Sequence, residues 1–246
     1  IRNFTSTSNG SGLEFQIIKT FTGPENNPDQ VHYSWQLTKA GSGYFTGEKV
    51  ELIGLGIDPI EVVAGERPAL EEKELDDLIK KLNEQSIIAV DTETSSLNPQ
   101  EANLVGISVS YAPNIAYYIP LDHKEVKGIK KETVLNKLKV ILEDSSIKKV
   151  GQNIKYDFII LKNNGVELNP VDDTMLLSYT LDAGNNRHNM DTLSELHLGH
   201  KTISYKDLVG TGKKQLNFSE VDIKAATEYA AEDADVTLRL YEILSN

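Results

Sequence analysis

Cysteine is absent from the 246-residue chain, and its absence excludes a disulfide scaffold, a thiol nucleophile and a zinc site with cysteine ligands. Basic residues are fewer than acidic ones: the chain has 25 Lys and Arg and 37 Asp and Glu, which give a formal net charge of −12. Taken alone, that balance argues against a basic nucleic-acid coat protein or a polybasic membrane binder. No apolar run approaches the roughly 18 residues that span a bilayer, and no signal peptide opens the chain. What remains is an ordinary globular composition, with 39% hydrophobic and 25% charged residues.

The composition of the chain changes near residue 67. Residues 1–67 hold short strand-like stretches separated by Gly, Pro and Asn clusters, which predict a small β-rich or partly irregular segment of unknown role. Residues 68–246 alternate amphipathic and apolar stretches, which predict one α/β domain. Because the sequence opens on Ile1 rather than Met, we expect it to be a piece of a longer protein.

Hydrophobic periodicity predicts the order of elements. In the first region we expect strands over residues 13–20, 32–37 and 49–53. In the second region we expect helices over residues 70–85, 133–143, 156–162 and about 219–244, and strands over residues 86–90, 104–111, 115–119 and 148–150. The last helix is expected to start at Ser219–Asp222, which has the spacing of a capping box.

The first carboxylate pair follows the predicted strand 86–90. Residues two apart on a strand point to the same side, so Asp91 and Glu93 converge at a strand end, a usual place for a site in an α/β sheet. A bare Asp-x-Glu is more often a solvated turn, and the pair alone establishes no site.

Two more patterns supply carboxylates from helices. Asp157 lies in the first turn of the predicted helix 156–162, where an Asp also complements the helix dipole. Tyr229 and Asp233 are four residues apart on the last helix and share a face, and the Ala-rich surroundings let that face approach other elements closely. We interpret the neighbouring Glu232 and Asp235 as a solvated acidic face.

Four carboxylates in one cleft would repel one another and raise each other's pKa values unless something neutralised them. Hard divalent cations that prefer oxygen ligands, Mg²⁺ or Mn²⁺, are the natural partners. Two such ions about 4 Å apart support in-line phosphoryl transfer by stabilising the attacking and the leaving oxygen. The four acids therefore predict a site for two Mg²⁺ or Mn²⁺ ions.

The three patterns together resemble the motifs of the DnaQ-like, or DEDDy, 3′→5′ exonucleases: Asp91-Thr-Glu93-Thr, Asn153-Ile-Lys-Tyr-Asp157 and Tyr229-Ala-Ala-Glu-Asp233. The connecting sequence is similar in particular to the proofreading domain of bacterial family A DNA polymerases, over about residues 68–246. The resemblance implies an RNase H-like fold, a mixed β-sheet flanked by α-helices. It also implies hydrolysis of the 3′-terminal phosphodiester of single-stranded or frayed DNA, with release of a 5′-deoxynucleotide.

The resemblance implies a role for each motif residue. Asp91 would bridge both metal ions, and Glu93 and Asp233 would complete the first metal site. Asp157 would hold the second ion largely through water, and Tyr229 would orient the attacking water.

Residues that touch the substrate also follow from the resemblance. Leu97 would wedge between the last two bases. Tyr205, which stands where the bacterial enzymes usually have Phe, would stack near the terminal nucleotide. The other candidate contacts to the strand and its phosphates are Thr92, Thr94, Gln152, Asn153, Lys155 and Arg187.

The expected partners are the 3′ end of single-stranded DNA and a covalently linked polymerase domain. No membrane is expected, the fragment is expected to be monomeric, and the location is expected to be the bacterial cytoplasm near the nucleoid. The acidic balance predicts weak DNA binding that depends on salt and metal. Two alternatives stay open: a stand-alone RNase D-like or helicase-associated 3′→5′ exonuclease, and a catalytically silent DNA-binding module of a polymerase.

Overall fold

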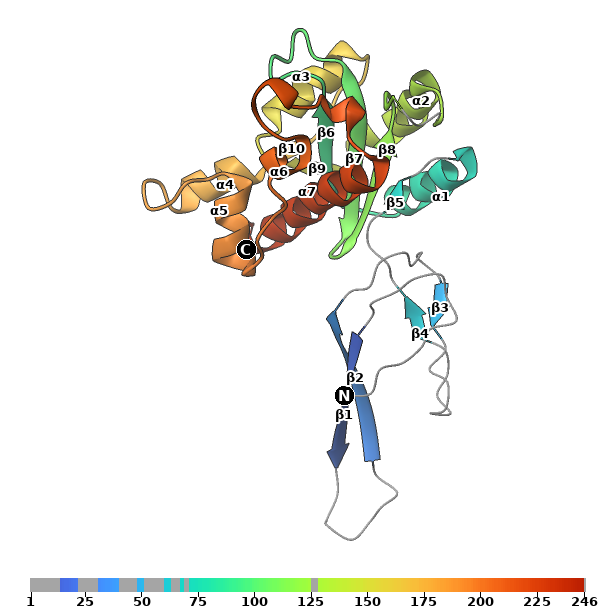
Figure 1. The fold of residues 1–246 in the computed structure, drawn as a ribbon, viewed down its shortest axis with the longest axis vertical. Coiled ribbons are helices and arrows are strands. Elements are labelled where there is room, and N and C mark those ends of the chain that lie inside the picture. The colour runs from blue at the N-terminus through green and yellow to red at the C-terminus, as the bar shows by residue number, and fades with distance from the viewer. Residues whose placement is uncertain are drawn as a thin grey trace. The chain divides into compact units, whose positions relative to one another are not determined.

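A computed structural model describes residues 14–21, 31–39, 48–50, 60–62, 67–68, 71–124 and 128–245. The chain separates into two units, Ile1–Ala64 and Gly65–Asn246 (Figure 1). In the first unit, β1 (Glu14–Phe21) pairs antiparallel with β2 (Val31–Lys39), and β3 (Glu48–Val50) pairs antiparallel with β4 (Ile60–Val62). The β1, β2 and β3 strands coincide with the three expected ones, although the end of the strand expected over residues 49–53 lies outside the described residues, and β4 was not expected.

The second unit is built on a mixed sheet with the strand order β10-β9-β6-β7-β8-β5. Its strands are β5 (Arg67–Pro68), β6 (Ile87–Thr94), β7 (Leu104–Ala112), β8 (Ile115–Pro120), β9 (Lys148–Gly151) and β10 (Val171–Asp173). The β6, β7 and β8 strands form an antiparallel meander, whereas β9 runs parallel to β6 and β10 runs parallel to β9. The predicted mixed sheet is confirmed, and β6 lies inside it with a partner on each edge.

Seven α-helices are described in this unit: α1 (Glu72–Asn83), α2 (Lys131–Leu142), α3 (Lys155–Asn163), α4 (Thr174–Leu181), α5 (Met190–Leu193), α6 (Tyr205–Val209) and α7 (Ile223–Leu244). Shorter turns are the π-helix Ser194–Leu198 and the 3-10 helices Gly212–Lys214 and Phe218–Glu220. Among the described residues, no helix is long and apolar enough to cross a membrane.

Helices cover both faces of the sheet, as the alternation along β8 shows. Tyr117 and Ile119 belong to the core that α1, α2 and α3 close, whereas Tyr118 belongs to the core under α7. Figure 1 shows α7 running across the sheet, and it contacts β6, β7, β8 and β9. Its inward face is lined by fully buried alanines, Ala226, Ala230, Ala231 and Ala234. The small side chains let α7 lie close to the strands, as the Ala-rich sequence predicted.

Two expected boundaries were wrong. The central strand does not end at residue 90, because β6 continues to Thr94 and its backbone pairs with β7 across Asp91, Thr92 and Glu93. The last helix does not begin at Ser219, which lies in a 3-10 turn capped by Asn217. Asp222 caps α7 instead, because its carboxylate accepts hydrogen bonds from the N–H groups of residues 224 and 225.

Candidate active site

Three carboxylates from two elements meet above the centre of the sheet. Asp91 and Glu93 are two residues apart on β6, and Asp233 comes from α7, which crosses that strand. One oxygen from each lies within 4.8 Å of the others, a spacing at which the three can share a metal ion. The structure therefore brings together acids that are 140 residues apart in the sequence.

The fourth acid, Asp157, reaches the cluster from the first turn of α3 and is 3% exposed. Its Oδ1 accepts hydrogen bonds from the backbone N–H of Thr92 at 2.9 Å and from the Thr92 hydroxyl at 2.5 Å. Thr92 lies between Asp91 and Glu93, so one residue of β6 fixes the position of Asp157 relative to both. Thr92 was expected to contact the DNA strand, but its side chain is buried, and its hydroxyl donates a hydrogen bond to the fourth carboxylate, that of Asp157.

The cluster is electrostatically costly without a counter-charge. Burial raises the pKa of Asp91 to about 6, against the opposing effect of the hydrogen bond from the Thr92 N–H. Burial, followed by the charges of neighbouring acids, raises the pKa of Glu93 well above its usual range. The pKa values of Asp157 and Asp233 are also raised well above the usual range, first by burial and then by the charge of Asp91.

One carboxylate oxygen of Glu93 also lacks a hydrogen-bond partner within the part of the chain that the structure describes. This oxygen, Oε1, is buried. A buried carboxylate oxygen without a partner is costly, and a hard cation would satisfy it. The clustering of the four acids and the unpartnered oxygen of Glu93 are both what a binding site for a divalent metal ion requires.

Tyr229 lies one helical turn before Asp233, and its hydroxyl, by hydrogen bonding to that carboxylate, partly opposes the rise in the pKa of Asp233 that burial and the charge of Asp91 cause. Burial, then the charges of Asp233 and Glu93, raises the pKa of Tyr229, so the phenol stays protonated at neutral pH. A protonated hydroxyl beside the carboxylates can hold and orient a water molecule.

Aromatic rings pack beside the carboxylates. Phe218 stacks on Tyr205 with ring centroids 6.5 Å apart and planes 5° apart, and it packs against Tyr229 at 6.1 Å. Tyr118 meets Phe218 edge-on and bonds His123 Nε2 through its hydroxyl at 2.7 Å. Phe218 was not among the expected site residues, because a single aromatic residue in a loop gives no sequence signal.

Gly106 on β7 makes room for this ring system. A Cβ at that position would lie 2.1 Å from the Tyr118 hydroxyl, so no larger residue fits without moving the tyrosine.

The other expected substrate contacts are exposed to different degrees. Leu97 is 94% exposed and Tyr205 is 39% exposed, so both can meet a ligand. Thr94 shares a 2.5 Å hydrogen bond with the hydroxyl of Tyr156, which also bonds the carbonyl of Ser96. Tyr156 thereby braces the segment that leads from β6 to Leu97.

The remaining candidates lie around the start of α3. Gln152 donates to the carbonyl of His188 at 2.7 Å, which fixes the segment next to the exposed Arg187. Asn153 has a φ of 64°, and its N–H is held by Asp173 at 2.9 Å. Lys155 is exposed and its ammonium bonds Asn153 Oδ1.

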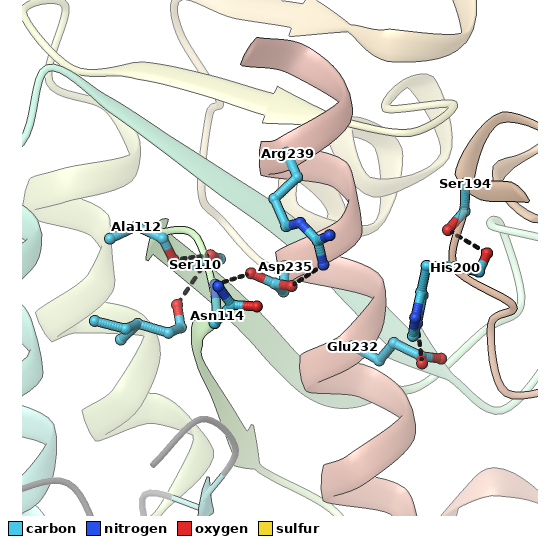
Figure 2. A network of polar contacts seen from close by, with 9 residues as sticks. Ser110, Ala112, Asn114, Ser194, His200, Glu232, Asp235 and Arg239 are labelled. Atoms are coloured by element: carbon cyan, nitrogen blue, oxygen red, sulfur yellow. Dashed lines mark hydrogen bonds and ion pairs between the residues drawn. The ribbon is translucent and has the colours of Figure 1, made fainter. Parts of the chain in front are cut away.

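The interpretation of Glu232 and Asp235 as a solvated acidic face was wrong. Asp235 is 9% exposed and accepts hydrogen bonds from the N–H of Asn114 and from Arg239. The side chain of Glu232 is 11% exposed, and both of its oxygens are hydrogen-bonded, one to His200 (Figure 2) and the other to the backbone N–H of Ile203. Their partners lie on other elements or a turn further along α7, so the local sequence could not show that they are buried.

The sheet, the crossing helix and the acid cluster define the class of protein first: a nuclease of RNase H-like fold. Among solved structures, Escherichia coli RNase D, an exoribonuclease involved in structured RNA processing, has a TM-score of 0.56 and 21% identity, over 73% of this chain and 44% of that one. That likeness shows the fold alone. Brucella melitensis NrnC with bound Mg²⁺ is 27% identical with a TM-score of 0.51, over 66% of this chain and 73% of that one.

Residues 67–246 match the 3′-5′ exonuclease family of DNA polymerase A, and the chain belongs to that family. DNA polymerase I of Rhizobium leguminosarum is 47% identical over 190 residues, which cover 69% of this chain and 19% of the relative. DNA polymerase I of Pseudomonas aeruginosa is 42% identical over 192 residues, which cover 76% and 21%. The chain thus spans about a fifth of the length of these relatives. It holds a 3′-5′ exonuclease domain, the enzyme class that the motifs predicted, and this domain is similar to the corresponding part of bacterial DNA polymerase I.

Proposed function

We propose that this domain hydrolyses the 3′-terminal phosphodiester of single-stranded or frayed DNA with two divalent ions, Mg²⁺ or Mn²⁺, and releases a 5′-deoxynucleotide. The observation that supports the proposal is the group of four carboxylates, of which Glu93, Asp157 and Asp233 are buried and Asp91 is half-buried; one oxygen of Glu93 has no hydrogen-bond partner among the described residues. When bound, divalent cations supply the positive charge that stabilises the attacking and leaving oxygens of such a displacement.

The protein side of the reaction divides among the named residues. Asp91, Glu93 and Asp233 would hold the first ion, and Asp91 with Asp157 would hold the second. Tyr229, kept protonated by its surroundings, would orient the attacking water beside Asp233. Leu97 and Tyr205 would bracket the terminal bases, because both expose apolar surface beside the site.

In a whole polymerase, the linked polymerase domain would deliver the 3′ end. A tethered substrate is presented at a high effective concentration, so the domain can work although the net charge of −12 on the 246-residue chain opposes DNA binding. The proposed role is therefore proofreading in the bacterial cytoplasm.

RNA is the alternative substrate, because the fold is shared with RNase D at 21% identity. The identity of 47% to a DNA polymerase I favours DNA.

Digestion of end-labelled oligonucleotides tests the proposal. We expect stepwise shortening of 5′-labelled single-stranded DNA and of a duplex with a mismatched 3′ end, only with Mg²⁺ or Mn²⁺, and slower shortening of RNA. Asp91→Ala should abolish shortening while the far-ultraviolet circular dichroism stays that of the folded protein. Wild-type activity in EDTA, or an Asp91→Ala protein as active as the wild type, would contradict the proposal.

A further inference from the structure

Glu232, the residue before the proposed metal ligand Asp233, has its own set of contacts outside the carboxylate cluster. Its Oε1 lies 2.8 Å from His200 Nε2 (Figure 2). Its Oε2 accepts a hydrogen bond from the backbone N–H of Ile203 at 2.6 Å. The tautomer of His200 with its hydrogen on Nε2 would donate to this Oε1, because a carboxylate oxygen accepts hydrogen bonds. Both oxygens of a side chain that is 11% exposed are therefore used to hold one segment.

That segment, residues 199–204, joins the π-helix Ser194–Leu198 to α6 and has neither helical nor strand structure. It begins at Gly199 with a φ of 61°, a left-handed conformation that favours glycine. At its other end Ile203 is two residues before Tyr205. Glu232 thus joins α7 to the chain immediately before the exposed ring that is expected to meet the substrate.

Tyr205 in turn faces the reaction centre. Its ring meets that of Tyr229 at 5.9 Å and 61°, and Tyr229 lies one turn of α7 before Asp233. The same stretch of α7 therefore carries a metal-binding carboxylate on one side and the anchor of the Tyr205 segment on the other.

We propose that Glu232 is a positioning residue: its two hydrogen bonds fix residues 199–204 so that Tyr205 holds the 3′-terminal nucleotide in register with the carboxylate cluster. This inference rests on the proposed function and concerns substrate binding. Glu232 also contributes to the raised pKa of Asp233, so a purely electrostatic effect on the metal site is the competing explanation.

Three variants separate the two explanations. Glu232→Ala removes both hydrogen bonds and the charge. Glu232→Gln removes the charge but keeps an oxygen for the Ile203 N–H and an amide that can donate to the other tautomer of His200. Glu228→Ala, one turn earlier on α7 with a side chain that is 48% exposed, removes the same charge at a solvated position and is the matched control.

Steady-state digestion of single-stranded DNA at saturating Mg²⁺ gives the test. We expect Glu232→Ala to raise KM about tenfold with kcat within about threefold of the wild type, because weaker positioning of a stacked base costs binding. Glu232→Gln should restore KM to within about threefold, and Glu228→Ala should leave KM and kcat unchanged. The Mg²⁺ concentration for half-maximal rate should be the same in all four proteins.

A double-mutant cycle with Tyr205→Ala tests whether Glu232 affects KM through Tyr205. We expect Glu232→Ala to add less than twofold to KM in the Tyr205→Ala background. An additive effect, a Glu232→Gln protein as impaired as Glu232→Ala, or a shifted Mg²⁺ dependence would each overturn the inference. If Glu232→Ala does not fold, His200→Ala takes its place, with an expected threefold rise in KM that vanishes in the same background.

The wild-type assay keeps this inference separate from the proposed function. Without Mg²⁺-dependent digestion by the wild type, the proposed function fails before any variant is compared. If the wild type and Asp91→Ala behave as proposed but Glu232→Ala keeps the wild-type KM, only the role of Glu232 falls.

Discussion

Buried acids of two kinds lie within one turn of α7. Asp233 faces the cluster with Asp91 and Glu93, where burial and neighbouring negative charge raise its pKa and the described protein supplies no cation. Asp235, two residues further, bonds the N–H of Asn114 and the guanidinium of Arg239. The partners of Asp235 stabilise the fold. The charge of Asp233 is unfavourable in the protein alone, and a bound metal ion would neutralise it. Burial of an acid is therefore not informative by itself; the presence or absence of a cationic partner separates the structural acid from the functional one.

Neutralising Asp233 should have the largest effect on activity. We expect Asp233→Asn to lower the exonuclease rate at least about a thousandfold, about 4 kcal/mol in the barrier, because a metal-binding oxygen is lost. Its unfolding free energy without metal should equal or exceed that of the wild type, since one of four mutually repelling acids is gone. Single-turnover digestion and urea unfolding in EDTA measure the two quantities, and a variant that keeps wild-type activity would remove Asp233 from the site.

The same substitution at Asp235 should lower the stability of the protein and leave its activity nearly unchanged. Asp235→Asn keeps one acceptor and places an amide N–H₂ against Arg239 or the Asn114 N–H, so we expect a loss of about 1–2 kcal/mol in unfolding free energy. Its exonuclease rate at a temperature where it is folded should stay within about threefold of the wild type. If Asp235→Asn were more stable than the wild type, or as slow as Asp233→Asn, the distinction between a structural Asp235 and a functional Asp233 would be wrong.

The dependence of stability on pH should also distinguish the cluster. The pKa of Asp91 is about 6 in the folded protein against 3.8 for an ordinary Asp, so between these pH values the folded state holds protons that the unfolded chain has released. The unfolding free energy without metal should therefore fall as pH rises through that window, and the raised pKa of Glu93 extends the fall above it. With saturating Mg²⁺ the trend should reverse, because metal binding needs the ionised carboxylates. Urea unfolding at pH 5, 6 and 7, with and without Mg²⁺, measures both trends, and an unfolding free energy that rises with pH in the absence of metal would contradict the prediction.

Substitution of Tyr205 by Phe should have the smallest effect. The hydroxyl of Tyr205 is not needed for stacking, so we expect Tyr205→Phe to keep KM within about twofold, whereas Tyr205→Ala should raise it about tenfold. Steady-state digestion of a single-stranded oligonucleotide compares them. Equal KM values for Phe and Ala would show that the ring does not contact the nucleotide.

The periodic elements could be predicted from the sequence because their signal is local. The β7 and β8 strands, the amphipathic α1 and the long α7 match their expected positions to within a few residues. The errors arose where pairing at a distance overrode local composition. Polar residues Asp91–Glu93 looked like the end of a strand, yet β7 supplies their backbone partners and β6 continues through them.

The site could be predicted only in part for the same reason. Motif spacing and the family resemblance marked the four acids and Tyr229, which the structure brings together. The support of Asp157 by Thr92, 65 residues earlier, and the packing of Phe218 on Tyr205 depend on tertiary contacts and leave no local pattern. Glu232 and Asp235 were misjudged because an acid next to other acids on a helix looks solvated until its partners are placed.

We attribute two features of the cluster to metal binding: the described residues supply no cation to the four acids, and they leave Glu93 Oε1 without a hydrogen-bond partner. The most direct measurement is the unfolding free energy of the wild type and Glu93→Gln as Mg²⁺ is raised from zero to saturation. We expect the two curves to cross: Glu93→Gln is the more stable protein in EDTA, and the wild type becomes the more stable one at saturating Mg²⁺ because only it gains the full binding free energy. A wild type that is already the more stable protein in EDTA and does not respond to Mg²⁺ would contradict the claim.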